Sequence, residues 1–292
     1  MPVRNTPGLR HLLSDVWPLL PGLVLLVVVF AIPLATMLPE SFAEADGFGT
    51  GRYREILTDG YYWSVLARSF WLSFVSTIIC LVLGYPVAYT LVRLTPASQK
   101  RLVYMIVIAP LFTSAVIRAM AWLVILGRRG IVNESLVGLG IIDVPIRMLY
   151  TDTAVIIGLV YIMIPFMVLT IAAVLENVNS TLEEAARDLG ATPLVAFWKV
   201  TFPLTLPGVF AGSFLVFALC LSSYVTPALL GGGRNKVMAM LIFEQFMRNF
   251  NWPLGAALSC VLLFITLVII WGYNKALARN VVGGRTGREA ML

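Results

Sequence analysis

Residues 180–208 read STLEEAARDLGATPLVAFWKVTFPLTLPG and lie between two runs that are apolar enough to cross a membrane. Ser180-x-x-Glu183 has the spacing of a helix capping box, and a second candidate box starts one residue later. Both glutamates fall in the first turn, where the helix dipole favours negative charge. Gly190 is placed to end the helix, because glycine readily adopts the left-handed conformation found after a helix C-terminus. We therefore predict a short helix that ends at Gly190.

The predicted helix carries one narrow stripe of apolar residues at helical spacing: Leu182, Ala185, Ala186 and Leu189. Glu183 and Arg187 form an i,i+4 pair of favourable polarity. A second short helix is predicted to follow at once, with Thr192 as its N-cap and Pro193 as its first residue. Pro203 is predicted to end that helix, because proline cannot donate a backbone hydrogen bond.

The first helix is predicted to contact another protein. An alternative is an amphipathic segment that lies on lipid, but such helices prefer Lys and Arg on their polar face. Here the stripe contains only Leu and Ala, and the opposite face is acidic. Small alanine side chains also allow a partner surface to approach closely. A protein partner is therefore favoured over the membrane surface.

The composition places these helices in an integral membrane protein. The chain has 292 residues, of which 59% are hydrophobic and 12% charged, and its mean hydropathy is +0.90. A soluble domain usually has about 25% charged residues. Six runs approach the length of about 20 residues that a spanning helix needs: 17–38, 66–92, 102–126, 154–175, 206–230 and 255–271. The predicted fold is all-α, with one leading helix and a core of five.

Six spans place both termini on the same side of the membrane. Lys and Arg are somewhat more frequent in the segments that share a side with the termini, and the positive-inside rule assigns that side to the cytoplasm. The net charge of +6 is then a topology signal, and no nucleic-acid partner is predicted. The first run resembles a signal peptide followed by Ala43-Glu44-Ala45, but it is too long for one, so we expect a retained helix.

The same stretch resembles a motif of a known family. Glu184-Ala185-Ala186, then three residues, Gly190, nine residues and Val200-Thr201-Phe202-Pro203 resemble the EAA motif of binding-protein-dependent ABC importer permeases. The usual Ile-x-Leu-Pro ending of the motif appears here as Val-Thr-Phe-Pro, which keeps the proline and the apolar character. The resemblance implies that Glu184, Ala185, Ala186 and Gly190 couple the permease to a cytoplasmic ATPase.

The strings at 114–127, 229–235 and 251–259 are similar to the spermidine/putrescine permease subfamily. That subfamily also includes importers of aminophosphonates, opines and amino-acid-like solutes, so the substrate remains open. The resemblance implies a second homologous permease subunit, an ATPase dimer and a periplasmic binding protein as partners, in a bacterial inner membrane. The expected segments are a cytoplasmic tail (1–16), a first transmembrane helix (17–38), a periplasmic loop (39–65), a permease core (66–275) with the coupling segment (180–204), and a basic cytoplasmic tail (276–292).

Several function classes are disfavoured by what the sequence lacks. It contains no G-x-x-x-x-G-K-[ST] phosphate loop, so ATP binding is expected in a separate subunit. Cys80, Cys220 and Cys260 lie far apart in apolar runs, and we predict no metal site, cofactor or catalytic residue. No Asp, Glu or His lies deep in a predicted span, which argues against a proton-coupled secondary transporter. A sodium-coupled carrier that uses backbone carbonyls stays open.

Four residues in the predicted central spans are candidates for the substrate path: Arg118, Trp122, Tyr161 and Tyr224. In a straight helix, Arg118 would lie roughly 24 Å from Arg101, either as a structurally paired arginine or at the outer mouth of the path. The aromatic residues could contact a cationic amine or pack within the bundle. Gly208-x-x-x-Gly212 is typical of helices that approach closely.

Overall fold

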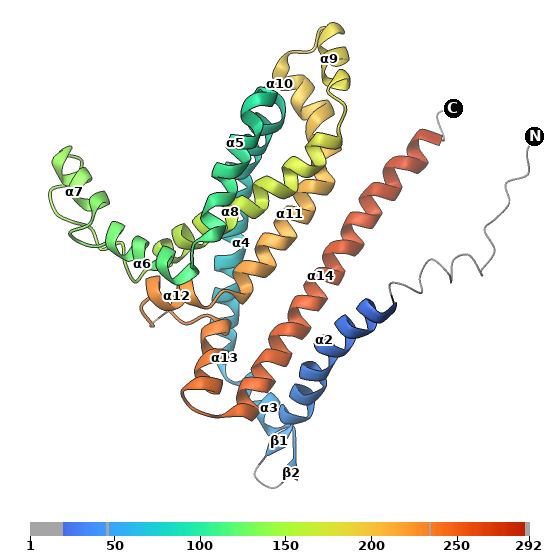
Figure 1. Cartoon of the computed structure of the whole chain (residues 1–292). Helices are drawn as coiled ribbons and strands as arrows, with labels where there is room; N and C mark the ends of the chain where they lie inside the picture. The colour runs from blue at the N-terminus through green and yellow to red at the C-terminus, as the bar shows by residue number, and fades with distance from the viewer. Residues whose placement is uncertain (1–19, 45–46, 234, 290–292) are drawn as a thin grey trace, which may run out of the picture. The chain divides into compact units, whose positions relative to one another are not determined.

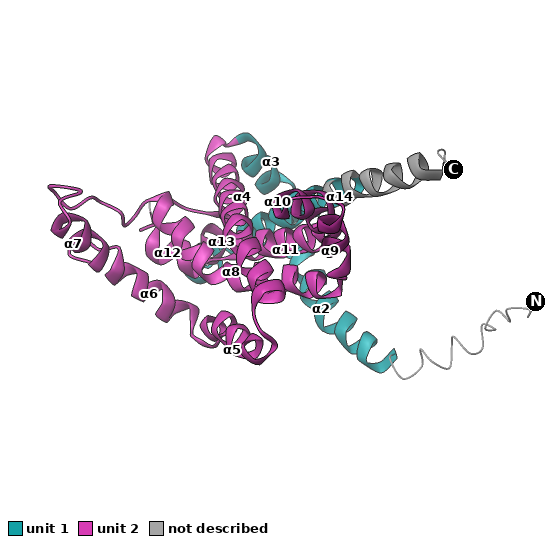
Figure 2. Ribbon diagram, turned by 90° about the horizontal axis from the view of Figure 1, so that it is seen from above, with its two compact units in different colours: residues 1–58, 244–292 teal, residues 59–243 magenta. Residues whose placement is uncertain are grey.

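The computed structural model of the chain describes residues 20–44, 47–233 and 235–289. The expected tail at 1–16 lies outside the described residues, as do the first three residues of the expected first span, Arg234 and residues 290–292. Helices make up most of the described chain (Figure 1). They form two compact units (Figure 2). One unit runs from Asp59 to Phe243, and the other combines the segments that precede and follow it.

The unit formed by the two ends of the chain contains two long apolar helices. These are α2 (Leu20–Glu40) and the opening part of α14 (Trp252–Glu289), and they pack against each other. A short hairpin of β1 (Ala43–Glu44) and β2 (Gly47–Phe48) follows α2. The carboxylate of Glu44 then accepts a hydrogen bond of 2.6 Å from the backbone N–H of Gly51, which starts α3 (Gly51–Thr58).

The larger unit is built around three long helices, α4 (Gly60–Tyr89), α8 (Asp152–Asn177) and α11 (Phe202–Ser222). Each packs against the other two. Met167, Ile171 and Leu175 on α8 are fully buried and lie at the centre of the core. The remaining elements of the unit are η2 (Thr90–Leu94), α5 (Ala97–Ile108), η3 (Ala109–Phe112), α6 (Ala115–Ile125), α7 (Ile131–Gly138), α9 (Thr181–Asp188), α10 (Pro193–Ala196), η4 (Phe197–Thr201), α12 (Val225–Leu230) and the start of α13 (Met238–Met247).

Two glycines allow α11 to approach α8 closely, as their spacing predicts. A Cβ atom on Gly208 would lie 2.8 Å from the Cβ of Val174, and one on Gly212 would lie 3.0 Å from the sulfur of Met167. A contact of 2.8 Å is shorter than real Cβ atoms show, and one of 3.0 Å is tight enough that the flexible side chain of Met167 would have to give way. The pair therefore fixes the packing distance between the two helices.

The all-α fold with six apolar spans is confirmed, with one span broken. Among the described residues, five helices are long and apolar enough to cross a membrane: 20–40, 60–94, 152–177, 193–222 and 252–272. Residues 97–112 and 115–125 make a sixth if they count as one span, although they are bent by 93°.

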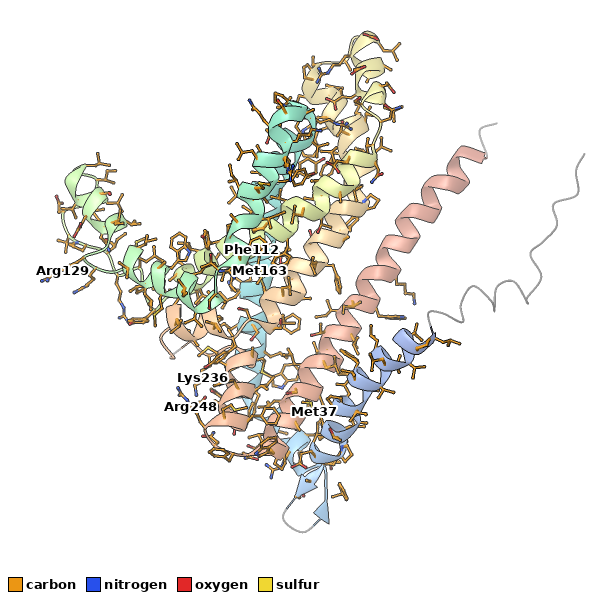
Figure 3. All side chains as sticks on the ribbon, viewed as in Figure 1. Met37, Phe112, Arg129, Met163, Lys236 and Arg248 are labelled. Atoms are coloured by element: carbon orange, nitrogen blue, oxygen red, sulfur yellow. The ribbon has the colours of Figure 1, made fainter. Side chains whose placement is uncertain are left out.

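The straight third span expected over 102–126 is wrong, because the helix breaks at Thr113 and Ser114. Thr113 is extended, with ψ of 141°, and Ser114 caps α6 by accepting a hydrogen bond from the N–H of Val116 at 3.3 Å. Pro110 lies in the preceding 3-10 turn η3 and has no N–H to continue a regular helix. Phe112 lies beside this break with 88% of its surface exposed (Figure 3).

Candidate coupling site

The short helix predicted from the opening stretch is α9, which lies at one end of the larger unit beside α10 (Figure 1). Its N-terminus differs from the prediction, because Ser180 makes no capping hydrogen bond. Ser180 has helical backbone angles, φ −61° and ψ −28°, whereas a capping serine is extended. Asn179 accepts the hydrogen bond from the N–H of Thr181 instead, at 3.0 Å. The predicted capping box is therefore wrong, although the helix itself forms.

The C-terminus of α9 agrees with the prediction in detail. Gly190 has a φ of +88°, in the left-handed region. Its N–H donates to the carbonyl of Arg187 at 2.9 Å, and the N–H of Ala191 donates to that of Ala186 at 3.0 Å. These two bonds define a Schellman motif, which satisfies carbonyls that the last turn leaves free. Gly190 thus sets where α9 ends and where the chain turns.

The apolar stripe of α9 faces away from the rest of the unit. We call Leu182, Ala185, Ala186 and Leu189 the docking stripe. Leu182 is 48% exposed, Leu189 is 90% exposed and Ala185 is also exposed, while Ala186 is half-buried. Glu184, the first residue of the EAA motif, is exposed as well. The exposed apolar residues of α9 make the docking stripe a candidate contact surface.

Glu183 points the other way, into the unit, and is only 7% exposed. Its carboxylate accepts three hydrogen bonds: from the hydroxyl of Tyr89 at 2.8 Å, from the hydroxyl of Thr201 at 3.0 Å, and from the guanidinium of Arg187 at 2.9 Å. The sequence predicted the bond to Arg187, which is local. The other two partners were missed because they come from distant parts of the chain.

The hydrogen bonds keep Glu183 ionised. Burial alone raises the pKa of a carboxyl group, but the hydrogen bonds from Tyr89 and Thr201 and the charge of Arg187 outweigh it, so the pKa of Glu183 is lowered. A lowered pKa means that the folded state holds the charged form more tightly than the unfolded chain does. The network therefore stabilises α9 at neutral pH.

We expect α9 to lose this stabilisation in acid. The contribution is complete above the ordinary pKa of 4.5 and is lost as the pH falls through the lowered folded-state pKa of Glu183. The groups that lower the pKa of Glu183 are Tyr89 from α4, Thr201 from η4 and Arg187 from α9. Hydrogen exchange of α9, compared with α7, measures the effect. The same pH dependence in Glu183→Gln would contradict it.

The second predicted helix is correct at its start and wrong at its end. Thr192 accepts a hydrogen bond from the N–H of Val195 at 3.4 Å, and Pro193 is the first residue of α10. The helix does not stop at Pro203, since it runs without a break through 193–222. The wider turn η4, in which the N–H of Phe202 bonds to the carbonyl of Phe197, carries the chain past the proline.

Aromatic packing holds η4 against α4. The ring of Phe197 lies 5.5 Å from that of Tyr85 and 5.6 Å from that of Tyr89, in edge-to-face geometry. The hydroxyl of Tyr85 also forms a hydrogen bond of 2.7 Å with that of Thr205 on α11. The region beside α9 is therefore a packed junction between α4 and α11.

The four substrate-path candidates have different partners, which divide them into a pair and two single residues. Trp122 and Tyr161 meet, with their ring centroids 5.6 Å apart. Tyr224 stacks on Phe243 instead, at 4.1 Å. Arg118 donates a hydrogen bond of 2.8 Å to the carbonyl of Pro110, across the break between η3 and α6. The break also invalidates the depth estimated for Arg118 on a straight helix, and this bond favours the structural interpretation of that arginine.

Comparison with known families gives one match that covers most of the chain. The family described as "Binding-protein-dependent transport system inner membrane component" matches residues 81–277. The chain is 36% identical to the spermidine/putrescine transport system permease protein PotB of Escherichia coli, over 88% of this chain and 96% of that protein. It is 28% identical to the molybdenum transport system permease protein ModB of Mycobacterium bovis, over 92% and 96%.

Solved structures show the same fold at low sequence identity. A bacterial ABC transporter that imports the acidic polysaccharide alginate aligns with a TM-score of 0.78 and 18% identity, over 93% of this chain and 98% of that chain. The MetNI methionine ABC transporter, in an inward-facing conformation, aligns with a TM-score of 0.55 and 19% identity, over 76% and 98%.

Proposed function

The chain belongs to the family of binding-protein-dependent transport system inner membrane components, and we propose from this premise that it forms half of the translocation path of an ATP-driven importer. It is a permease subunit and carries out no chemistry itself. A separate ATPase dimer hydrolyses ATP, and a second homologous permease supplies the other half of the path. A periplasmic binding protein delivers the solute.

The observation that carries this proposal is the docking stripe on α9. The stripe is exposed, ends at the Schellman motif of Gly190, and coincides with the EAA motif. We assign Glu184, Ala185, Ala186 and Gly190 to the contact with the ATPase. In this arrangement, both termini and α9 lie in the cytoplasm, the loop at 39–65 lies in the periplasm, and residues 66–275 form the permease core.

The proposed solute is a small polyamine such as spermidine or putrescine. The support is the 36% identity to permeases that carry that name. The paired rings of Trp122 and Tyr161 also offer π faces, which attract cationic amines. Tyr224 is a further candidate for the path. Arg118 stays a candidate for the path, because one of its guanidinium nitrogens bonds to the carbonyl of Pro110 while its buried Nε has no hydrogen-bond partner among the described residues.

Reconstitution of the complete transporter in vesicles tests this function. We expect uptake of labelled putrescine or spermidine to require ATP, the ATPase and the binding protein, and the isolated chain to show no uptake under any ion gradient. Uptake by the chain alone, driven by an ion gradient, would establish a secondary transporter instead. ATP-dependent uptake of an aminophosphonate, an opine or an amino acid, but not of a polyamine, would overturn the substrate and leave the permease assignment in place.

A further inference from the structure

Glu183 lies on the side of α9 opposite the docking stripe and bonds to two other elements of the unit. We propose that Glu183 is a positioning residue that fixes α9 to the ends of α4 and η4. Since η4 continues into α11, a shift of α9 would then move both α4 and α11. This inference rests on the proposed function, in which α9 docks on the ATPase. It adds the route by which the movement enters the bundle.

The two tethers reach different parts of the bundle. Tyr89, which donates to Glu183 at 2.8 Å, is the last residue of α4. Thr201, which donates at 3.0 Å, is the last residue of η4 and continues directly into α11. One carboxylate therefore connects α9 to α4 and to α11. These are two of the three core helices, and both pack on the third, α8.

The covalent links of α9 are poorly suited to transmit a movement. Before α9 the chain passes through Val178, which is extended, and after it the chain bends at Gly190. A buried carboxylate with three donors is a stiffer connection, because separating any donor leaves charge or polar groups unpaired in a dry environment. The backbone before α9 has its own tether, since Arg93 donates to the carbonyl of Val178 at 2.7 Å. That bond holds the linker, whereas Glu183 holds the helix.

The test uses the complete transporter in vesicles and measures polyamine uptake per ATP hydrolysed, together with the amount of ATPase that co-purifies. For Glu183→Ala we expect the ATPase to stay bound and uptake per ATP to fall about tenfold, within the usual range of coupling between sites. In Glu183→Gln, uptake per ATP should fall less, because the amide oxygen of the glutamine still accepts hydrogen bonds from the two hydroxyls. Uptake per ATP should also fall in Tyr89→Phe. The double variant with Glu183→Ala should lose no more uptake per ATP than Glu183→Ala alone, because both substitutions remove the same hydrogen bond.

Tyr104→Phe is the matched control. It removes another tyrosine–glutamate hydrogen bond, of 2.7 Å to Glu176, which joins α5 to α8 and does not involve α9. Uptake per ATP should be unchanged in this variant. If the transporter with Glu183→Ala does not assemble, the inference is tested by uptake per ATP in Glu183→Gln and Tyr89→Phe.

Two results would overturn the inference. One is normal uptake per ATP in the Glu183 and Tyr89 variants. The other is loss of uptake in proportion to loss of bound ATPase, which would mean that Glu183 only shapes the docking helix. Failure of the proposed function would look different, because the wild-type transporter itself would then show no ATPase binding or no ATP-dependent uptake.

Discussion

Gly190→Val is expected to lower ATP-driven uptake, and the amount of ATPase in the purified complex, about tenfold or more. The φ of +88° at Gly190 lies where an L-residue costs about 1–2 kcal/mol, and a β-branched residue is worse suited still. No atom lies within 4 Å of a Cβ added there, so the strain, and not a clash, would unwind the end of α9. Leu189 would then leave the docking stripe. A loss of about 1.4 kcal/mol in ATPase binding is tenfold in affinity, and Gly190→Ala should show a smaller effect.

Gly140→Val provides the matched control. Gly140 ends α7 with the same two bonds, from its N–H to Val137 and from the N–H of Ile141 to Leu136, each 3.0 Å. Its φ is +68°, and no atom lies within 4 Å of an added Cβ. The two substitutions should therefore cost similar stability, measured by thermal unfolding of the permease. Only the one at Gly190 should release the ATPase, and equal retention of the ATPase in both variants would contradict the docking assignment.

Local signals in the sequence were enough to place α9 and its C-terminal end. The left-handed glycine and the Thr192-Pro193 start of α10 depend on the backbone preferences of single residues, and both appear in the structure. The docking stripe is likewise visible as a spacing of apolar residues. Its partner is not, because no local pattern says what covers an exposed stripe. That assignment came from the resemblance to a family.

The long-range features could not be read from the sequence. Glu183 looked like one half of a capping box and of a salt bridge with Arg187, because both are local patterns. Its bonds to Tyr89 and Thr201 depend on the packing of α4 against η4. Once packing buries the carboxylate, these donors compete for it, and the capping geometry is lost.

The wrong predictions for the third span and for the end of the second short helix have a common cause: both were made from local sequence without the tertiary packing. An apolar run reports only that a segment prefers a dry environment, so 102–126 gave no sign that the chain turns by 93° within it. Conversely, Pro203 was read as a stop, although tertiary packing of Phe197 and a single wide turn keep the helix continuous. Proline removes one backbone hydrogen bond from a regular helix, and the packing around it determines whether the helix continues or ends.

Ala185→Trp is expected to prevent assembly with the ATPase while leaving the permease folded. Ala185 lies in the docking stripe and is exposed, so a large side chain there can extend into solvent from the described part of the chain. If the ATPase approaches the small alanine closely, as the proposed docking requires, the indole would hold the two surfaces apart. Overpacking of a buried contact costs about 1–3 kcal/mol, so we expect the co-purified ATPase to fall tenfold or more and uptake to fall with it.

Ser135→Trp tests whether any exposed tryptophan has this effect. Ser135 is a small, exposed residue on α7, which is as short as α9 and lies outside the coupling segment. Thermal unfolding should be unchanged in both variants, since neither replaces a buried side chain. ATPase binding should fall only for Ala185→Trp. If the ATPase remains bound to that variant at the wild-type level, the docking stripe, with its exposed Leu182 and Leu189, is not the surface that contacts the ATPase.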